Sequence, residues 1–484
     1  MYDIFVISDD VVGRKMAGPG IRAWELSKSL AKHFKVVLGI PDYSGTEEDD
    51  GFFKSLSFDV IRYSVEKPEL LQKIGVESRI ILTQGYILSK FPFLKDLSAQ
   101  LIIDLYVPFP LENLFVHKWK IPKLKDREYI HLNDLKVFND QILCGDHFLC
   151  ANERQRDLFM GALMSLNRIN PEILDTDASL KKLISIVPFG ISEERGLMAS
   201  ELGGKSLEEL GTVPVGEEQA EGALRSKIPN IREEDIILIW GGVITNWFDP
   251  KTLIKAVAEA VKQESRVKLF FLSTKHPNPL LPEFDMAKEA VDLAKNLGLE
   301  NKFVFFNKEW IDYAERGAYF KDADIGVSIH ETHFETVYSF RTRILDYLKF
   351  DLPVLCTEGD FFAGLVEKEK LGITVPSGKV EELAQAIITL AQNKEMRSRM
   401  IKNIKKIKPS FYWDRVTEPL VEYCHTAILQ KTKSREGRGK PVNSKWQMVN
   451  KTRESRKRWR NLFWKWGQKL PLRISAKFKR LFRI

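Results

Sequence analysis

Short apolar runs alternate with amphipathic stretches along most of the chain. Each run is long enough for a buried strand, and the polar stretches between them, such as AGPGIRAWELSKSLAKHF, have the spacing of a helix with one apolar face. Strands that alternate with helices predict a parallel sheet with crossover connections. In the first part of the chain the expected strands are residues 2–8, 35–40, 58–64, 79–85 and 99–109.

The same alternation starts again after a break in composition. Residues 193–234 are rich in Gly, Glu and Ser and show little periodicity, so we expect a linker or excursion there. A strand-like run ending in Gly241 and Gly242 follows, and Pro250 suits the first turn of the next helix. The pattern predicts two doubly wound α/β domains, and 484 residues with 44% apolar content can fill two cores.

The polar stretch between the expected strands at residues 325–329 and 353–356 carries the richest chemistry of the second half. Ligands of open parallel sheets bind beyond the carboxyl ends of the strands, where this loop must lie. Two guanidinium groups can clamp a diphosphate, and a carboxylate one turn later can accept two ribose hydroxyls. The residues concerned are His330, Glu331, His333, Glu335, Arg341, Arg343 and Asp346.

With these residues, the stretch resembles the C-terminal domain of retaining nucleotide-sugar glycosyltransferases of the family 4 (group 1) type, which have the glycosyltransferase-B fold. Their motif places two Glu eight residues apart ahead of a Gly-x-Pro-Val strand. Here Asp346 stands at the second position and Tyr338 at the first. The resemblance therefore implies that Asp346 binds the ribose, and Glu331 or Glu335 could supply the missing carboxylate toward the donor sugar.

The resemblance also implies where the donor binds. A Gly-rich loop with Gly18 and Gly20, followed by Arg22, matches the family's loop beside the donor, although GPG before a helix is equally a plain tight turn. The Arg and Lys that usually hold the pyrophosphate after the first strand of the second domain are missing. We therefore expect Gly241, Gly242, Arg341 and Arg343 to bind it, with Arg341 and Arg343 stabilising the leaving group. The base is expected between Asn307 and Trp310, where Trp310 either stacks on it or packs in the core.

On the acceptor side the resemblance points to Asn152, Glu153 and Arg154, with a solvated helix start as the alternative. The His that often faces the donor sugar is missing, and Asp104 is either polar in the cleft or a bracing carboxylate. Asp322 and Asp324 resemble a DxD metal motif but precede their strand. We therefore expect neither a metal nor a cofactor beyond the nucleotide-sugar substrate.

The expected organisation is a glycosyltransferase-B fold, with two Rossmann-like domains facing a central cleft. The family's chain crosses between domains at a turn like the VPFG of residues 187–190 and returns through a terminal helix. The boundaries are an acceptor-side domain at 1–192, the linker at 193–234, a nucleotide-sugar domain at 235–408, the returning helix at 409–430 and a basic aromatic tail at 431–484.

Charge is unevenly distributed between body and tail. Residues 431–484 hold 19 Lys and Arg against 2 Glu, so they carry +17, and residues 1–430 carry −9 of the total +8. Basic residues interleaved with Trp and Phe at 446–484 predict an anionic membrane surface as partner, with nucleic acid as the weaker alternative. Residues 431–445 have the composition of a disordered segment.

Four Cys without metal-like spacing, no signal-peptide pattern and no apolar run of membrane-spanning length predict a cytoplasmic protein at the inner face of a membrane. The expected reaction is sugar transfer from a nucleotide diphosphate sugar to a saccharide or lipid-linked, bacterial acceptor, with retention and without metal. Two alternatives stay open: a UDP-sugar 2-epimerase or hydrolase of the same fold, and a non-catalytic binding protein derived from a transferase.

Overall fold

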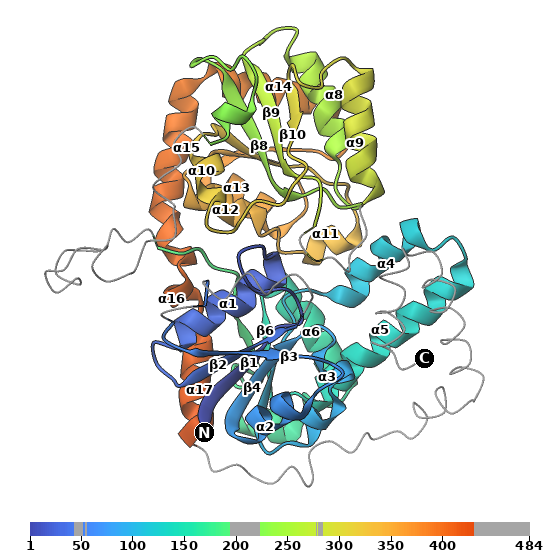
Figure 1. Cartoon of the computed structure of the whole chain (residues 1–484), viewed down its shortest axis with the longest axis vertical. Helices are drawn as coiled ribbons and strands as arrows, with labels where there is room; N and C mark the ends of the chain where they lie inside the picture. Colours follow the sequence, from blue (N-terminus) through green and yellow to red (C-terminus); the bar gives the residue numbers. More distant parts are fainter. Residues whose placement is uncertain (43–51, 54–55, 194–222, 277, 279–283, 430–484) are drawn as a thin grey trace, which may run out of the picture.

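Two parallel sheets, each covered by helices, lie one above the other along the long axis of the molecule (Figure 1). The computed structural model describes residues 1–42, 52–53, 56–193, 223–276, 278 and 284–429. Among them the strands pair only in parallel, apart from isolated bridges. The α/β fold class expected from the alternating pattern is confirmed.

The first sheet has seven strands in the order β3-β2-β1-β4-β5-β6-β7. Its central strands are buried on both faces, which explains their near-continuous apolar runs. The strand order reverses between β1 and β4, and the carboxyl end of such a switch point is where a ligand crevice forms. The strands are β1 (Tyr2–Ile7), β2 (Val36–Pro41), β3 (Asp59–Tyr63), β4 (Ser78–Gln84), β5 (Gln100–Asp104), β6 (His147–Cys150) and β7 (Ile184–Ile186).

Helices connect these strands, and two of them form a long pair that extends past the edge of the first sheet (Figure 1). The pair consists of α4 (Phe109–Lys120) and α5 (Leu124–Cys144). Because α4 follows β5, its first turn lies near the carboxyl end of the sheet. The other helices of this body are α1 (Gly18–Leu30), α2 (Glu69–Val76), α3 (Ile87–Lys90), η2 (Pro92–Asp96), α6 (Glu153–Ser165) and α7 (Pro171–Thr176).

The second sheet has six strands in the order β10-β9-β8-β11-β12-β13, with its switch point between β8 and β11. The strands are β8 (Ile236–Val243), β9 (Val267–Ser273), β10 (Val304–Phe306), β11 (Ile325–Ser328), β12 (Val354–Thr357) and β13 (Gly372–Val375). The helices are α8 (Pro250–Ala260), α9 (Asp285–Asn296), α10 (Arg316–Lys321), α11 (Phe334–Tyr338), α12 (Arg343–Lys349), α13 (Phe361–Glu369), α14 (Val380–Gln392) and α15 (Lys394–Ile407).

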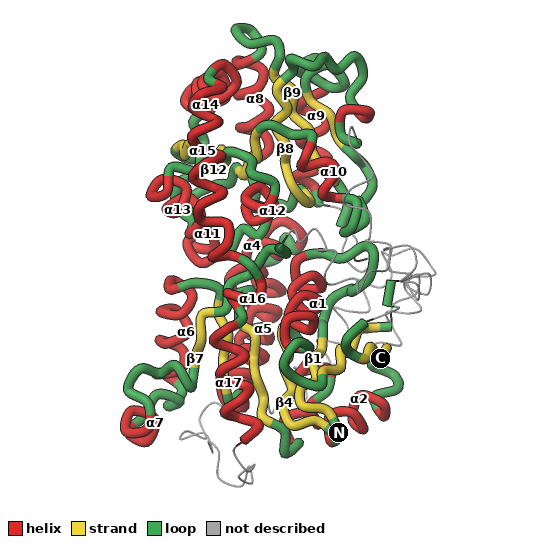
Figure 2. The backbone as a smooth tube through the Cα atoms, turned by 90° about the vertical axis from the view of Figure 1, so that its left-hand side faces the viewer, coloured by secondary structure: helices red, strands yellow, loops and turns green. Residues whose placement is uncertain are grey.

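The chain passes between the two bodies twice, and the two crossings are hydrogen-bonded to each other. Ile191 N donates to Phe411 O at 2.8 Å, and Trp413 N donates to Ile191 O at 3.1 Å. A Cβ on Gly190 would lie 2.7 Å from the Trp413 ring, so only glycine fits there. The returning segment is broken into η4 (Lys408–Phe411), α16 (Trp413–Val416) and α17 (Glu418–Leu429), and α17 packs on the first body (Figure 2).

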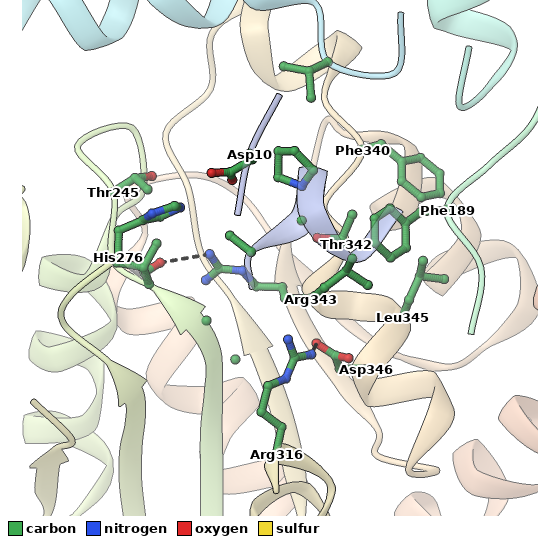
Figure 3. A pocket seen from close by; sticks show the side chains of 18 of the residues that line it. Asp10, Phe189, Thr245, His276, Arg316, Phe340, Thr342, Arg343, Leu345 and Asp346 are labelled. Carbon is green, nitrogen blue, oxygen red and sulfur yellow. Dashed lines mark hydrogen bonds and ion pairs between the residues drawn. The ribbon is translucent and has the colours of Figure 1, made fainter. Parts of the chain in front are cut away.

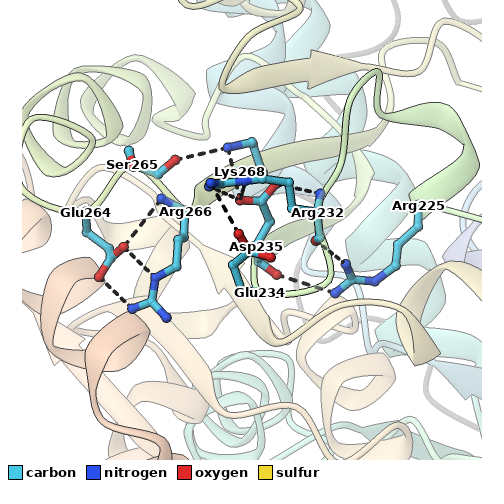
Figure 4. A network of polar contacts seen from close by, with 8 residues as sticks. All are labelled: Arg225, Arg232, Glu234, Asp235, Glu264, Ser265, Arg266 and Lys268. Carbon is cyan, nitrogen blue, oxygen red and sulfur yellow. Dashed lines mark hydrogen bonds and ion pairs between the residues drawn. The ribbon is translucent and has the colours of Figure 1, made fainter.

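Charged residues brace the amino end of the second sheet, far from the switch point (Figure 4). The fully buried Asp235 carboxylate accepts from Arg232 Nη2 at 2.8 Å and lies 3.5 Å from Lys268 Nζ. Most of the predicted linker, residues 194–222, lies outside the described residues. The chain after it includes η3 (Arg225–Lys227), and Arg225 donates to the Asp235 carbonyl in this network. The network fixes the start of β8.

The two carboxylates of the DxD-like motif belong to this same end of the sheet. Asp322 Oδ2 accepts from the backbone N–H groups of Leu224 and Arg225 at 2.9 and 3.2 Å. Asp324 Oδ2 accepts from Ile237 N at 2.9 Å. Both side chains therefore organise backbone at the amino end of β8 and β11, opposite the crevice.

Candidate active site

A cleft of about 460 Å³ lies between the two bodies, at the carboxyl ends of both sheets (Figure 3). The first body lines it with Asp10, the start of α1 and one side of α4. The second body contributes the turn after β8 and the starts of α10 and α12. The two switch points of the sheets thus face one common space.

Arg343, the first residue of α12, forms the cationic centre of this space. Its guanidinium carbon lies 4.5 Å from the centre of the Trp240 ring and 4.0 Å from that of Phe248. Nη2 donates to Val243 O at 3.2 Å, whereas the buried Nη1 has no hydrogen-bond partner among the described residues. Burial lowers the pKa of Arg343 to about 10, so the group stays charged at neutral pH. The Trp240 and Phe248 rings stabilise the Arg343 cation, and its Nη1 is available to donate to a ligand.

A second guanidinium, that of Arg316, lies close by in the same cleft (Figure 3). It begins α10, and its Nη2 donates to Asp346 Oδ2 at 2.6 Å. Its Nε is buried and has no hydrogen-bond partner in the described part of the chain. No motif marks Arg316 in the sequence, and only the pairing of α10 with α12 reveals it.

Asp346, the predicted ribose ligand, lines the cleft beside Arg316. Burial raises the pKa of its carboxyl, and the neighbouring Arg316 acts in the opposite direction. Oδ2 is engaged by Arg316, which fixes the orientation of the carboxylate. The structure therefore brings Asp346 to the cleft, and its contact with ribose stays a prediction.

Arg341 does not lie beside Arg343 as the diphosphate hypothesis expects. Its Nη2 donates to Glu335 Oε2 at 2.7 Å, and both side chains of this ion pair are about 5% exposed, at 6% and 4%. The Arg341 guanidinium carbon lies 4.9 Å from the centre of the Phe248 ring, which Arg343 also contacts, but Arg341 does not belong to the cleft lining. Because α12 begins only at Arg343, the two arginines are not held on one helical face. Arg341 thus neutralises Glu335 instead of lining the cleft.

The two glutamates expected near the donor sugar are placed differently as well. Glu335 is buried in its pair with Arg341, and Glu331 is exposed to solvent. Neither belongs to the cleft lining. Among the described residues, the structure therefore leaves no second-body glutamate in the position of the missing motif residue.

The glycine turn after β8 lines the cleft, but one of its two amides is already used. Gly241 N donates to the Tyr347 hydroxyl at 2.9 Å, which removes it as a phosphate donor. Gly242 has φ +82° and open space where a Cβ would be, so a ligand can come close to its backbone. The predicted phosphate contact is retained only for Gly242.

The glycines of the first body have separate functions. Gly18 lines the cleft and begins α1. A Cβ on Gly20 would lie 1.9 Å from Val11 O, so Gly20 is required by close packing of the backbone and not by a ligand. Only Gly18 can border the donor.

Arg22 is not a ligand-binding residue in this structure, contrary to the expectation. It is completely buried, and Nη2 donates to Asp104 Oδ1 at 3.0 Å and to Val187 O at 2.9 Å. Nη1 donates to Pro188 O at 3.0 Å. With Asp104, this side chain ties α1 and β5 to the first interdomain crossing, so Asp104 is a bracing carboxylate.

The predicted acceptor-side residues join the two bodies at the edge of the cleft. Asn152 caps α6 by accepting from Gln155 N at 2.9 Å, and Glu153 is exposed. Arg154 Nη1 donates to Gly359 O of the second body at 2.7 Å. Gln155 Nε2 donates to Tyr338 O, also in the second body, at 2.8 Å. Arg154 and Gln155 thus link the two bodies, and none of the three predicted residues lines the cleft.

At the predicted base site, Trp310 lines the cleft and Asn307 supports it. Trp310 Nε1 is buried without a hydrogen-bond partner among the described residues. Asn307 Nδ2 donates to Leu272 O and Glu309 O at 3.0 and 2.9 Å, which fixes the loop. His276, 5.9 Å from Trp310 between ring centres, also lines the cleft, and burial lowers its pKa to about 4. The imidazole is therefore neutral.

Two carboxyl groups of the first body face the cleft, and sequence reasoning did not select them. Asp10 accepts from Asn278 Nδ2 across the interface at 2.7 Å, and burial raises its pKa to about 6. Glu112, in the first turn of α4, has its pKa raised to about 7 by burial and by the negative charge of Glu335. Their only sequence signal was an acidic residue just after a predicted strand.

We expect Glu112 to make stability depend on pH. The unfolded chain releases the Glu112 proton near its ordinary pKa of 4.5, whereas the folded chain keeps it to about pH 7. Because the folded state binds the extra proton in this window, the free energy of unfolding falls as pH rises through it. Urea denaturation from about pH 5 to about pH 8 should show a smaller loss for Glu112→Gln than for the parent. Equal slopes, or the same flattening with the exposed Glu153→Gln, would contradict this.

The two walls of the cleft differ in charge. The second body offers Arg316 and Arg343 with unused N–H donors, and the first body offers Asp10 and Glu112. Guanidinium groups in a low-dielectric cleft bind oxyanions such as phosphate, whereas carboxyl groups bind hydroxyls. The arrangement suits a ligand that is anionic at one end and polyhydroxylated at the other.

Comparison with known proteins agrees with this arrangement. Residues 224–407 match the family model described as Glycosyl transferases group 1. No curated protein matches the sequence at a significant level. The structure is similar to that of Anabaena Alr3699/HepE in complex with UDP and glucose, with a TM-score of 0.59 and 14% identity over 88% of this chain and 100% of that one.

Two further solved structures show the same architecture. Sucrose-phosphate synthase (tll1590) from Thermosynechococcus elongatus has a TM-score of 0.57 and 15% identity over 88% of this chain and 99% of its own. WaaG, a glycosyltransferase involved in lipopolysaccharide biosynthesis, has a TM-score of 0.51 and 13% identity, covering 87% and 98%. At such identities the likeness concerns the fold. The second domain therefore matches the model of the group 1 glycosyltransferases, and the architecture of the chain is the glycosyltransferase-B fold.

Proposed function

We propose that the chain transfers a sugar from a nucleotide diphosphate sugar to a hydroxyl of a saccharide or lipid-linked acceptor. The observation that carries this is the pair of cleft arginines, Arg316 and Arg343, each with a buried N–H that has no partner among the described residues. A diphosphate supplies the oxygens that such donors need. In this assignment Asp346 binds the ribose and Trp310 borders the base, and the UDP in the Anabaena neighbour favours uridine.

The chemistry follows from where charge develops. The bond between the sugar C1 and the β-phosphate oxygen breaks, the acceptor oxygen bonds to C1, and the acceptor proton passes to the leaving phosphate. Attack from the same face keeps the anomeric configuration. Preorganised guanidinium groups stabilise the developing phosphate charge in a low-dielectric cleft, which is the principal catalytic contribution we assign to the protein. This assignment gives the charge-stabilising role to Arg343 and Arg316 and does not require a metal.

The direct test is calorimetric titration with UDP-, GDP- and ADP-sugars, followed by product analysis with and without EDTA. Binding of one nucleotide class, with release of the nucleoside diphosphate that EDTA does not abolish, supports the proposal. A sugar nucleotide epimerised or hydrolysed in preference to transfer would instead indicate the 2-epimerase or hydrolase chemistry. Failure of every donor to bind would leave a non-catalytic protein with this fold.

We expect Asp346→Asn to raise the Michaelis constant for the donor more than it lowers turnover. An amide accepts hydroxyl hydrogen bonds less strongly than a carboxylate, and hydrogen bonds to charged groups contribute about 1.5–3 kcal/mol. Steady-state kinetics over a range of donor concentrations measures the effect. Because Arg316 is paired with Asp346, thermal unfolding is the necessary control. A collapsed melting temperature with unchanged donor affinity would show that the carboxylate is structural.

We also propose that the basic aromatic tail binds an anionic membrane surface. Residues 430–484 lie outside the described residues, so the argument rests on the +17 charge and the interleaved Trp and Phe of the sequence. Each Lys or Arg near an acidic bilayer adds about 1 kcal/mol of attraction. None of the helices that the structure describes is both long and apolar enough to span a bilayer.

Deleting residues 431–484 should release the protein from acidic vesicles while activity on a soluble acceptor persists. Cosedimentation with phosphatidylglycerol vesicles measures the effect, and neutral phosphatidylcholine vesicles are the control. Equal sedimentation of the truncated and full chains with acidic vesicles would exclude the tail as the anchor. Displacement of the full chain from the vesicles by duplex nucleic acid at the same salt concentration would favour nucleic acid as the partner.

A further inference from the structure

A groove runs from the centre of the cleft along helix α4. Three residues of α4 spaced four apart, Glu112, Val116 and Lys120, line the cleft and so form one stripe of the helix. Eight residues of helix correspond to about 12 Å, so the stripe extends beyond the reach of a single sugar ring. No predicted site residue lies on this helix, and its only signal is the acidic Glu112 just after a predicted strand.

The facing wall comes from the second body and is aromatic. Trp247 and Phe284 both line the cleft, and their rings meet edge to face at 6.0 Å between centres. The Lys120 ammonium lies 5.0 Å from the centre of the Phe284 ring, which brings the end of α4 against this wall. Trp247 remains partly exposed, so its ring can receive a ligand.

The polar groups at the two ends of the stripe are unused. Neither the Glu112 carboxyl nor the Lys120 ammonium has a hydrogen-bond partner among the described residues. Around Glu112 the charged groups are Glu335 and Arg341, which already pair with each other at 2.7 Å. Burial lowers the pKa of the Lys120 ammonium, and the negative charge of Asp285 acts in the opposite direction. One end therefore offers hydrogen-bond acceptors and the other offers donors.

We propose that this groove, between α4 and the rings of Trp247 and Phe284, is a saccharide subsite that holds the acceptor. The inference rests on the proposed glycosyl transfer and adds the chemical class and position of the acceptor. Aromatic faces with a few convergent polar groups fit the apolar C–H face and the hydroxyls of a sugar ring. The Glu112 carboxyl at the inner end disfavours a second diphosphate there, because the nearby Arg341 is already paired with Glu335.

The test is saturation-transfer NMR and tryptophan-fluorescence titration of the full chain, with and without UDP. The probes are methyl glycosides of glucose, galactose, mannose and N-acetylglucosamine, and the disaccharides maltose and cellobiose. We expect at least one probe to bind. At about pH 8, where the Glu112 carboxyl is mostly charged, Glu112→Gln, which preserves shape, should raise the Kd of that probe about tenfold, the effect of one lost hydrogen bond to a charged group. Trp247→Ala should abolish binding and Trp247→Phe should restore part of it. Lys120→Met should weaken it.

The matched control is Lys118→Met, on the same helix but exposed and outside the cleft lining. It should leave saccharide binding unchanged, and UDP affinity should be unchanged in all five variants. If no probe binds, or if Glu112→Gln and Trp247→Ala both bind as the parent does, the subsite is wrong. If the parent chain does not bind UDP, the donor assignment is wrong instead. The two failures can be told apart, because the saccharide titration without UDP tests the groove alone.

Discussion

Replacing Arg343 with alanine is expected to lower turnover with a nucleotide-sugar donor by about 10²–10³-fold, the cost of one preorganised donor to a developing oxyanion. Arg343 packs against the rings of Trp240 and Phe248, and its Nη1 has no partner among the described residues. The loss should be greater in kcat than in KM, because the leaving group gains charge only in the transition state. Arg343→Lys should recover little, since an ammonium cannot reproduce the fixed fork.

The control for this prediction is Arg341→Gln, two residues away and outside the cleft lining. Because Arg341 neutralises the buried Glu335, this change should mainly lower stability and leave kcat near the parent value in the protein that remains folded. Calorimetric unfolding and single-turnover rates on the same preparations separate the two effects. Near-normal turnover of Arg343→Ala, or an equal loss in Arg341→Gln, would remove Arg343 from its assigned role.

Arg341 and Arg343 also show how far the site could be predicted from the sequence. The apolar runs gave both sheets, because a strand buried on two faces must be apolar throughout. The carboxyl ends of those strands predicted where the cleft lies, and the predicted residues Arg343, Asp346 and Trp310 do line it. Arg343 begins α12 and lines the cleft, whereas Arg341 precedes this helix and pairs with Glu335, and periodicity does not locate a helix boundary to within two residues.

Contacts between segments distant in the sequence explain the other differences. Gly20 is fixed by Val11 O, and Gly241 N by the Tyr347 hydroxyl, and neither partner lies within the motif that drew attention to the glycine. Arg316 carries no local signal, and Glu112 shows only as an acidic residue just after a predicted strand. They come to the cleft because α10 packs beside α12 and because α4 extends across to the second body (Figure 1).

Replacing Arg22 with methionine is expected to lower the free energy of unfolding by about 3–5 kcal/mol, because it leaves the Asp104 carboxylate buried and uncompensated. The side chains of the Arg22–Asp104 pair are 0% and 1% exposed, and Arg22 also donates to two carbonyls of the interdomain crossing. The double variant Arg22→Met/Asp104→Leu should recover part of the loss, since it removes the buried charge.

The exposed pair Lys32–Asp414 joins the turn after α1 to α16 with side chains 53% and 48% exposed, and it provides the contrast for Arg22. Lys32→Met should cost less than about 1 kcal/mol, because solvent screens this pair. Urea denaturation measures all these variants, and UDP titration below the transition distinguishes the two roles considered for Arg22. If Arg22→Met unfolds like the parent but loses UDP affinity, the side chain binds the donor after all. If stability falls while the folded fraction binds UDP normally, Arg22 is part of the brace that fixes α1, β5 and the interdomain crossing.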